Sequence, residues 1–382
     1  MPEKYFIKTF GCQQNVADSE RLASYYAARG FERALTLGET DVLVLNTCVI
    51  RDRAEEKVYG MVKSLRERLG RKSPRIVVTG CLIGAAAREP SGKMMKRLTA
   101  RLPEVEFLPM EDIGFEYVPE RATGKVASIV ISNGCNNYCA FCIVPFSRGK
   151  ERSRAFDDIL AETEKAVQYG YEEVVLLGQN VNSYGADFLM EKLKEGEVYT
   201  LPDGKKVKPV LVKHLNRQRI PTLFPYLLER VAQIPGLRKV SFMSSNPWDF
   251  SDELIMVMAR HENIDRTIHL PIQSGSDAVL KRMNRWYTRE EYLALISRIR
   301  AKVPGVRFTT DIIVGFPGET LEQFEESVTL VEQVDFMKTF IAWYSPRPGT
   351  AAAKGMADGV PIEEKQRRFH ALDALAFKGK CG

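Results

Sequence analysis

Three cysteines stand close together near the middle of the chain, in the run Cys135-Asn-Asn-Tyr-Cys139-Ala-Phe-Cys142. Thiolates are the protein ligands of iron–sulfur clusters, and three of them leave one iron of a four-iron cluster without a protein ligand. That open iron is a position where a substrate or a cofactor can bind. A structural zinc site is the alternative, but such sites usually have four ligands and this loop contains no histidine. The spacing therefore favours an iron–sulfur cluster.

Three further cysteines lie in the first quarter of the chain, and each follows a short apolar run. The runs Tyr5–Thr9, Asp41–Asn46 and Arg75–Thr79 predict strands that end just before Cys12, Cys48 and Cys81. Ligand sites of open parallel sheets lie at the carboxyl ends of the strands, so these thiols are expected to meet. A single cysteine is more often a small buried apolar residue. Three cysteines at equivalent positions favour a second set of metal ligands.

Helical patterns separate these three strands. Ser19–Arg29, with Asp18 or Ser19 as its N-cap, and Arg53–Leu69 predict helices. The first part is therefore a βαβαβ unit. Residues 102–124, which contain three prolines, have the composition of a connector. We predict an N-terminal open parallel α/β domain at residues 1–122.

A second alternating series begins near residue 125. Its predicted strands are Val126–Ser132, Glu173–Leu177, Lys239–Met243, Thr267–Pro271, Arg307–Val314 and Lys338–Tyr344. Helical patterns near residues 156–169, 222–234, 251–261, 288–302 and 320–333 separate them. Six such units predict an α/β fold, a partial (β/α)6 barrel at residues 123–355, whose chemistry lies on the loops after the strands. The loop from Cys135 to Cys142 follows the first of these strands.

Two segments depart from this alternation. Residues 187–220 are rich in lysine and contain a hairpin pattern around Asp203-Gly204, so a surface insertion is expected there. Residues 356–382 form a short tail with one helical stretch, Ile362–Lys378. No C-terminal RNA-binding β-barrel is expected in that tail. Cys381, near the end of the chain, is interpreted as a thiol that is not a ligand.

The bulk composition is that of a globular protein. The formal net charge is +6 and the pI is near 8.8, which permits a polyanionic partner without requiring one. We find no signal peptide and no run of about 18 apolar residues, so no membrane span is expected and the cytoplasm is the expected location. One basic run, Arg148, Lys150, Arg152 and Arg154, is either a solvated face or a contact for phosphate.

The cysteine spacing, with Phe141 just before the third cysteine, resembles the radical S-adenosylmethionine (SAM) superfamily. Other runs resemble its methylthiotransferase branch, and the likeness extends from about residue 5 to about residue 370. These runs are Phe10-Gly-Cys12-Gln-Gln-Asn, Asn46-Thr-Cys48, Gly178-Gln-Asn-Val-Asn-Ser-Tyr184, His269-Leu-Pro-Ile-Gln-Ser-Gly-Ser-Asp277, Asp311-Ile-Ile-Val-Gly-Phe-Pro-Gly-Glu-Thr320 and Tyr344-Ser-Pro-Arg-Pro-Gly-Thr350.

The resemblance implies two 4Fe-4S clusters and SAM as cofactors. The implied metal ligands are Cys12, Cys48 and Cys81 for an auxiliary cluster, and Cys135, Cys139 and Cys142 for the SAM-binding cluster. The implied SAM-binding residues are Phe141, Gln179, Gln273, Ser274, Val314 and Gly315. The run from Val314 to Glu319 is equally consistent with an ordinary strand-to-helix turn, and Ser276 with a helix cap. No further residue is assigned a catalytic role.

The resemblance also implies a reaction. One SAM would methylate a sulfur at the auxiliary cluster, and a second would yield the radical that removes hydrogen from carbon 2 of an isopentenylated adenosine beside the tRNA anticodon. A reducing donor such as flavodoxin or ferredoxin would be a partner. The basic run would then contact tRNA phosphate or the SAM carboxylate. Alternative substrates are threonylcarbamoyl-adenosine in tRNA and a ribosomal-protein aspartate. The alternative class is a non-catalytic iron–sulfur electron carrier or a metal-stabilised RNA-binding protein.

Overall fold

The computed structural model describes residues 1–49, 52–70, 73–119, 121, 124–187, 189, 198–214 and 218–378. The chain forms two compact units. The first contains Met1–Gly124, Asn133–Cys135 and Ile143–Lys150, and the second contains Lys125–Ser132, Asn136–Cys142 and Glu151–Gly382. The cysteine loop thus contributes residues to both units. Within the described residues, no helix has the length and apolar character needed to cross a membrane.

The first unit is built on a five-stranded sheet with the order β2-β1-β3-β4-β5, in which every pairing is parallel. The three predicted strands are confirmed as β1 (Lys4–Thr9), β3 (Val42–Thr47) and β4 (Arg75–Gly80). Two short edge strands, β2 (Glu32–Arg33) and β5 (Glu106–Leu108), were not predicted. At two and three residues, they are too short to leave an apolar pattern.

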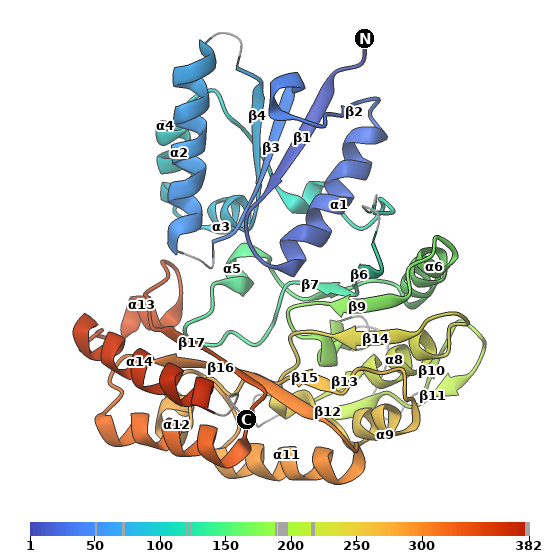
Figure 1. The fold of residues 1–382 in the computed structure, drawn as a ribbon, viewed down its shortest axis with the longest axis vertical. Helices are drawn as coiled ribbons and strands as arrows, with labels where there is room; N and C mark the ends of the chain where they lie inside the picture. Colours follow the sequence, from blue (N-terminus) through green and yellow to red (C-terminus); the bar gives the residue numbers. More distant parts are fainter. Residues whose placement is uncertain are drawn as a thin grey trace. The chain divides into compact units, whose positions relative to one another are not determined.

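Helices cover both faces of this sheet (Figure 1). The apolar side chains of α1 (Gln13–Ala27) pack on one face, and those of α2 (Asp52–Leu69), α3 (Cys81–Arg88) and α4 (Lys93–Arg101) pack on the other. The shorter elements of this unit are η1 (Leu37–Glu39), η3 (Met110–Asp112) and α5 (Val144–Ser147).

The start of the first helix was predicted wrongly. Helix α1 begins at Gln13 with Cys12 as its N-cap, six residues before Ser19. The side-chain oxygen of Asn15 accepts a hydrogen bond from the Cys12 backbone N–H at 3.3 Å, which satisfies one donor at the helix start. Asp18 lies inside this helix and is therefore not its N-cap. Its buried carboxylate forms ion pairs with Arg21 and Arg148.

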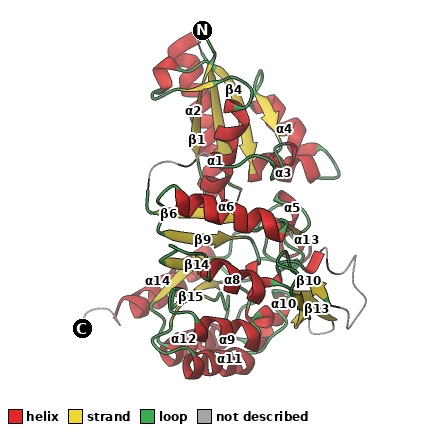
Figure 2. Ribbon diagram, turned by 90° about the vertical axis from the view of Figure 1, so that its right-hand side faces the viewer, coloured by secondary structure: helices red, strands yellow, loops and turns green. Residues whose placement is uncertain are grey.

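The second unit contains the six strands predicted for the partial barrel. They are β6 (Val126–Val130), β9 (Glu173–Leu177), β14 (Lys239–Phe242), β15 (Thr267–His269), β16 (Arg307–Val314) and β17 (Lys338–Trp343). They form two parallel three-stranded sheets, β14-β9-β6 and β15-β16-β17. Figure 2 shows β6, β9 and β14 side by side. Val240 of β14 forms an isolated parallel bridge with Ile264, which lies just before the start of β15. This bridge connects the two sheets.

The predicted helices of the barrel are also present. They are α6 (Phe156–Gln168), α8 (Phe224–Ala232), α9 (Asp252–Arg260), α11 (Arg289–Lys302) and α12 (Leu321–Val334). Further short elements are β7 (Ser132–Asn133), β8 (Arg152–Ser153), η4 (Val181–Ser183), η5 (Pro247–Asp249) and α10 (Asp277–Arg282). One large apolar core lies between the strands and these helices.

The hairpin predicted within residues 187–220 and the helix predicted in the tail are both present. The hairpin around Asp203-Gly204 is formed by β10 (Tyr199–Thr200) and β11 (Lys206–Val207). A second hairpin, β12 (Val210–His214) with β13 (Gln218–Thr222), was not predicted. The tail contains α14 (Ile362–Lys378), preceded by α13 (Ala351–Gly355). Cys381 and residues 188, 190–197 and 215–217 lie outside the described residues.

Candidate metal centres

The three N-terminal cysteines follow three neighbouring strands of the first unit. Strands β3 and β4 pair in register, with Thr47 opposite Gly80, so Cys48 and Cys81 leave the sheet at the same level. Neighbouring strands lie about 4.8 Å apart. Strand β1 pairs with the other side of β3, and Cys12 follows it at the start of α1. The strand order thus brings the three cysteines to one edge of the sheet.

Asn15 connects two of these thiols. Its side chain is fully buried. Its Oδ1 accepts from the Cys12 Sγ at 3.4 Å, while its Nδ2 lies 4.0 Å from the Cys81 Sγ and donates to the Thr47 carbonyl at 3.2 Å. Burial is the main cause that raises the pKa of the Cys81 thiol, and the nearby Cys48 and Cys12 raise it further. Cys48 and Cys12 therefore both lie within electrostatic range of Cys81.

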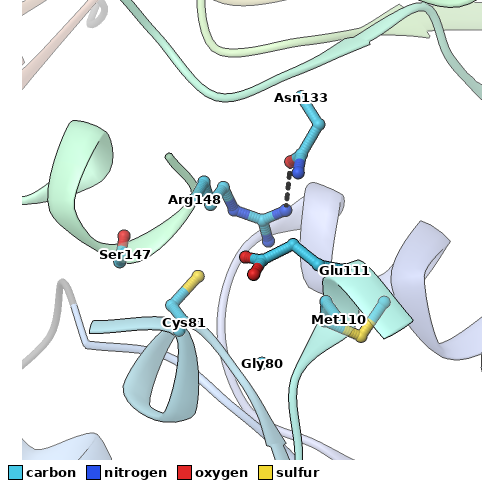
Figure 3. A pocket seen from close by; sticks show the side chains of 8 residues that line it. Gly80, Cys81, Met110, Glu111, Asn133, Ser147 and Arg148 are labelled. Atoms are coloured by element: carbon cyan, nitrogen blue, oxygen red, sulfur yellow. Dashed lines mark hydrogen bonds between the residues drawn. The ribbon is translucent and has the colours of Figure 1, made fainter. Parts of the chain in front are cut away.

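The buried guanidinium of Arg148 lies beside the edge of the sheet that carries the three cysteines, which we call the thiol edge, in the pocket shown in Figure 3. The pocket is lined by Gly80, Cys81, Gly84, Met110, Glu111, Asn133, Ser147 and Arg148. The Arg148 side chain extends between Cys81 and Asn133 and donates to the Asn133 Oδ1 at 2.9 Å. It also donates to the buried Asp18 carboxylate at 2.7 Å. Burial alone would lower the pKa of Arg148, but Asp18 and then Cys81 raise it above its ordinary value, so the group is a fixed cation.

The donor set of this edge suits an iron–sulfur cluster. Within the described part of the chain, no three Cys, His, Asp or Glu side chains are grouped tightly enough to hold a single metal ion. Three cysteines at one edge match the thiolate ligands of a cluster with one open iron. The buried cation of Arg148 suits the negative charge that such a cluster carries.

The cysteine motif is anchored separately in each unit. In the first unit, the Cys135 N–H donates to the Gly149 carbonyl at 3.2 Å. In the second unit, the Cys142 N–H donates to the Cys139 carbonyl at 2.9 Å, and the Cys139 Sγ accepts from Arg285 at 3.4 Å. Cys135 and Cys139 are buried and Cys142 is partly buried.

The residues proposed to bind SAM all belong to the second unit, and several are committed to internal contacts. Phe141 and Gln179 are partly buried. Gln273 has a φ of 75° and bridges to β16 through its backbone. The Ser274 hydroxyl is fully buried and lies 3.4 Å from the hydroxyl of Ser327. Its side chain is therefore held against α12.

The turn after β16 is also stabilised internally. Val314 is fully buried, and Gly315 has a φ of 66°. The Gly315 N–H donates to the Glu319 carboxylate at 2.5 Å, and that carboxylate pairs with Arg368 of α14 at 2.9 Å. This arrangement agrees with the simpler interpretation, a strand-to-helix turn. SAM binding by these residues stays a prediction.

The basic run divides into two buried and two exposed side chains. Arg148 pairs with Asp18 in the first unit, and Arg154 pairs with Glu162 at 2.6 Å in the second. Lys150 and Arg152 are exposed. Two members of the run are thus committed to buried carboxylates, and Lys150 and Arg152 keep exposed side chains.

Glu151, within the same run, is a buried acid of the second unit. Its Oε1 accepts from the Ser183 hydroxyl at 2.6 Å. Burial raises the pKa of Glu151 well above its usual range, and Asp249 and Asp187 raise it further. The folded protein therefore holds a proton that the unfolded chain releases above a pH of about 4.3.

We expect the Glu151→Gln variant to be more stable than the parent at pH 8 and about equally stable below pH 4. The free energy of unfolding of the parent is unaffected by Glu151 ionisation below the pKa that Glu151 has in the unfolded chain. As the pH rises from there toward the higher pKa of Glu151 in the folded protein, the parent loses stability. A glutamine at residue 151 keeps the shape of the side chain and stays neutral at every pH, so the variant does not lose stability in this way. Urea unfolding between pH 4 and 8 measures the difference, and Glu164→Gln, at an exposed position of α6, is the control. A pH-independent difference would contradict the assignment.

The sequence predicts the six cysteines as ligands but does not mark the groups that surround them. Asn15, Asp18 and Arg285 were not selected as site residues. Asn15 had a detectable signal, since it occupies the third position after an N-cap cysteine. The other two act through contacts between distant segments, and no local pattern marks them.

Two known protein families match this chain. Residues 129–331 match the family described as the radical SAM superfamily, and residues 4–99 match the uncharacterized protein family UPF0004. The fold also resembles that of a radical SAM methyltransferase, TsrM from Kitasatospora setae, with a TM-score of 0.61 and 14% identity over 92% of this chain and 77% of that chain. The fold and the cysteine motif define a radical SAM enzyme.

Relatives with names identify the branch. The tRNA-2-methylthio-N(6)-dimethylallyladenosine synthase of Thermotoga petrophila is 40% identical over 390 residues, which cover 97% of this chain and 80% of that protein. The synthase of the same name from Syntrophomonas wolfei is 40% identical over 99% of this chain and 82% of its own length. The chain belongs to the radical SAM methylthiotransferase family. This membership argues against a non-catalytic carrier or RNA-binding module.

Proposed function

We propose that the protein transfers a methylthio group to carbon 2 of N(6)-isopentenyladenosine beside the anticodon of tRNA. The observation that carries this proposal is the presence of two sets of three cysteines, one at the edge of the N-terminal sheet and one in the loop after β6. One cluster would serve SAM cleavage and the other would serve the sulfur. The names of the two synthases favour the isopentenylated base over the alternative substrates.

In this proposal the chain's own residues hold and shield the reacting groups. Cys12, Cys48 and Cys81 would bind an auxiliary 4Fe-4S cluster, and Cys135, Cys139 and Cys142 would bind the SAM-binding cluster. When bound, the clusters and SAM supply the radical and sulfur chemistry. Asn15 fixes two of the thiols, and Arg148 keeps a positive charge beside Cys81. Lys150 and Arg152 would contact tRNA phosphate, and flavodoxin or ferredoxin would supply electrons.

Two triple variants test the proposal after anaerobic reconstitution. Two four-iron clusters predict about eight irons in the parent and about four in either Cys12/Cys48/Cys81→Ala or Cys135/Cys139/Cys142→Ala. Only the second variant should lose SAM cleavage to 5′-deoxyadenosine, because only its motif would bind SAM. Zinc in place of iron, or SAM cleavage that survives in the second variant, would refute the assignment of the two sites.

The substrate is tested with synthetic anticodon stem-loops. One carries N(6)-isopentenyladenosine beside the anticodon, and a matched one carries threonylcarbamoyl-adenosine. Mass spectrometry of the nucleosides should show the gain of a methylthio group, in place of hydrogen, only in the first. Modification of the second stem-loop alone would favour the alternative tRNA substrate.

A further inference from the structure

Three consecutive residues after α10 hold the cysteine loop of the second unit. The Met283 carbonyl accepts from the Ala140 N–H at 2.9 Å. Asn284 then donates to the Tyr138 carbonyl at 3.0 Å. Arg285 donates from Nη1 to the Cys139 Sγ at 3.4 Å. Only the third contact reaches a proposed cluster ligand.

Arg285 is a buried cation. Its exposure is 6%, and its guanidinium lies 4.7 Å from the ring centre of Trp248. Its oxygen partners are neutral: the Asn246 Oδ1 at 3.0 Å, the Pro271 carbonyl at 2.8 Å and the Tyr287 hydroxyl at 3.0 Å. Within the described ranges of the chain, the hydrogen-bond partners of Arg285 include no carboxylate.

A buried charge without a counter-ion is costly to the folded state. The other buried arginines near the proposed sites have carboxylate partners: Arg148 pairs with Asp18, and Arg154 pairs with Glu162. Among the described residues, the Cys139 sulfur is the contact of Arg285 that becomes anionic on binding iron. A cluster-bound cysteine is a thiolate. The surroundings of Arg285 are therefore balanced when Cys139 binds iron.

We propose that Arg285 is the counter-ion of the Cys139 thiolate and sets the reduction potential of the cluster that this cysteine holds. This inference rests on the proposed function, because it requires a cluster at Cys139. A hydrogen bond from a cation to a ligand sulfur favours the reduced cluster, which carries one more negative charge. Arg285 thus acts as a positioning residue that makes the one-electron reduction by an external donor easier.

The test isolates one cluster. In the full chain with Cys12/Cys48/Cys81→Ala, the reconstituted cluster is titrated anaerobically with dithionite and followed by electron paramagnetic resonance. Arg285→Gln should hold about tenfold less reduced cluster at a fixed potential, which corresponds to a midpoint about 59 mV lower for a one-electron couple. Arg285→Lys, which keeps the charge, should show a smaller fall. Lys281→Gln, at an exposed position of α10, should match the parent.

The outcomes separate this inference from the proposed function. A parent without a cluster at the Cys135–Cys142 motif would refute the proposed function. A parent with the cluster, and an Arg285→Gln variant with the same iron content and the same midpoint, would refute only the role of Arg285. If Arg285→Gln does not fold, Arg285→Met keeps the apolar stem against Trp248 and should show the same fall. If neither variant folds, Arg285→Lys decides: it should lower the midpoint by less than about 59 mV, because it keeps the charge but not the planar hydrogen-bonding group, and a midpoint equal to the parent's would refute the inference.

Discussion

Replacing Asp18 with asparagine should lower the free energy of unfolding of the first unit by about 3–5 kcal/mol, the cost of breaking a buried ion pair by removing one partner. Asp18 is fully buried and accepts from Arg21 at 2.6 Å and from Arg148 at 2.7 Å. Both arginines are themselves buried, so the Asp18→Asn variant leaves two cations without their carboxylate. Thermal and urea unfolding of the full chain measure the loss.

An exposed pair on the same unit provides the control for this loss. Lys63 and Glu67 lie 3.8 Å apart on α2, with side chains that are 78% and 63% exposed. Glu67→Gln should therefore change stability by no more than about 0.5 kcal/mol. Equal effects of Asp18→Asn and Glu67→Gln would show that the Asp18 cluster is hydrated in solution.

Acid should reproduce part of the Asp18→Asn effect. Burial alone would raise the pKa of Asp18, but Arg148 and Arg21 together lower it below its usual value. A lowered carboxyl pKa contributes stability that is present above the unfolded pKa, about 3.9, and is lost as pH falls through the folded pKa. The stability difference between parent and Asp18→Asn should therefore shrink below about pH 4. A difference that persists unchanged at pH 2 would contradict this assignment.

Most helices and strands of this fold could be predicted from the sequence, because each is marked by a pattern within its own segment. A run rich in apolar and β-branched residues, such as Val42–Thr47 or Arg307–Val314, marks a strand, and the six barrel strands were placed within a few residues. Short edge strands such as β5 escaped, since three residues form no pattern. The start of α1 was missed because cysteine is not among the usual N-cap residues.

The candidate site shows the same division between local and distant information. The cysteines could be predicted as ligands because three lie in one short segment and three follow equivalent strand ends. The partners of Arg148 were not, because Asp18 lies 130 residues away in the chain. A basic run in a sequence does not reveal which of its members will meet a buried carboxylate. Here two of them do, and the other two keep exposed side chains.

Strands β3 and β4 approach each other closely at the thiol edge, so a side chain added at Gly80 should strongly destabilise the first unit. Gly80 has a φ of 90° and a ψ of −159°, a conformation that essentially only glycine adopts. A Cβ at this position would lie 2.4 Å from the Asn46 Oδ1 and 2.4 Å from the Thr47 carbonyl oxygen. These atoms belong to the strand that ends at Cys48. Any side chain at residue 80 would therefore push apart the strand ends that carry Cys48 and Cys81.

We expect Gly80→Ala to destabilise the first unit by about 2–6 kcal/mol, the sum of about 1–3 kcal/mol for backbone strain and about 1–3 kcal/mol for overpacking. It should also reduce the iron bound by the Cys135/Cys139/Cys142→Ala variant, in which only the N-terminal cysteines remain. Gly60→Ala is the matched control, because Gly60 lies in α2 with no atom within 4 Å of its added Cβ. That substitution should stabilise the helix by about 0.5–1 kcal/mol. If Gly80→Ala kept both its iron and its stability, the spacing of the strand ends would not control the auxiliary site.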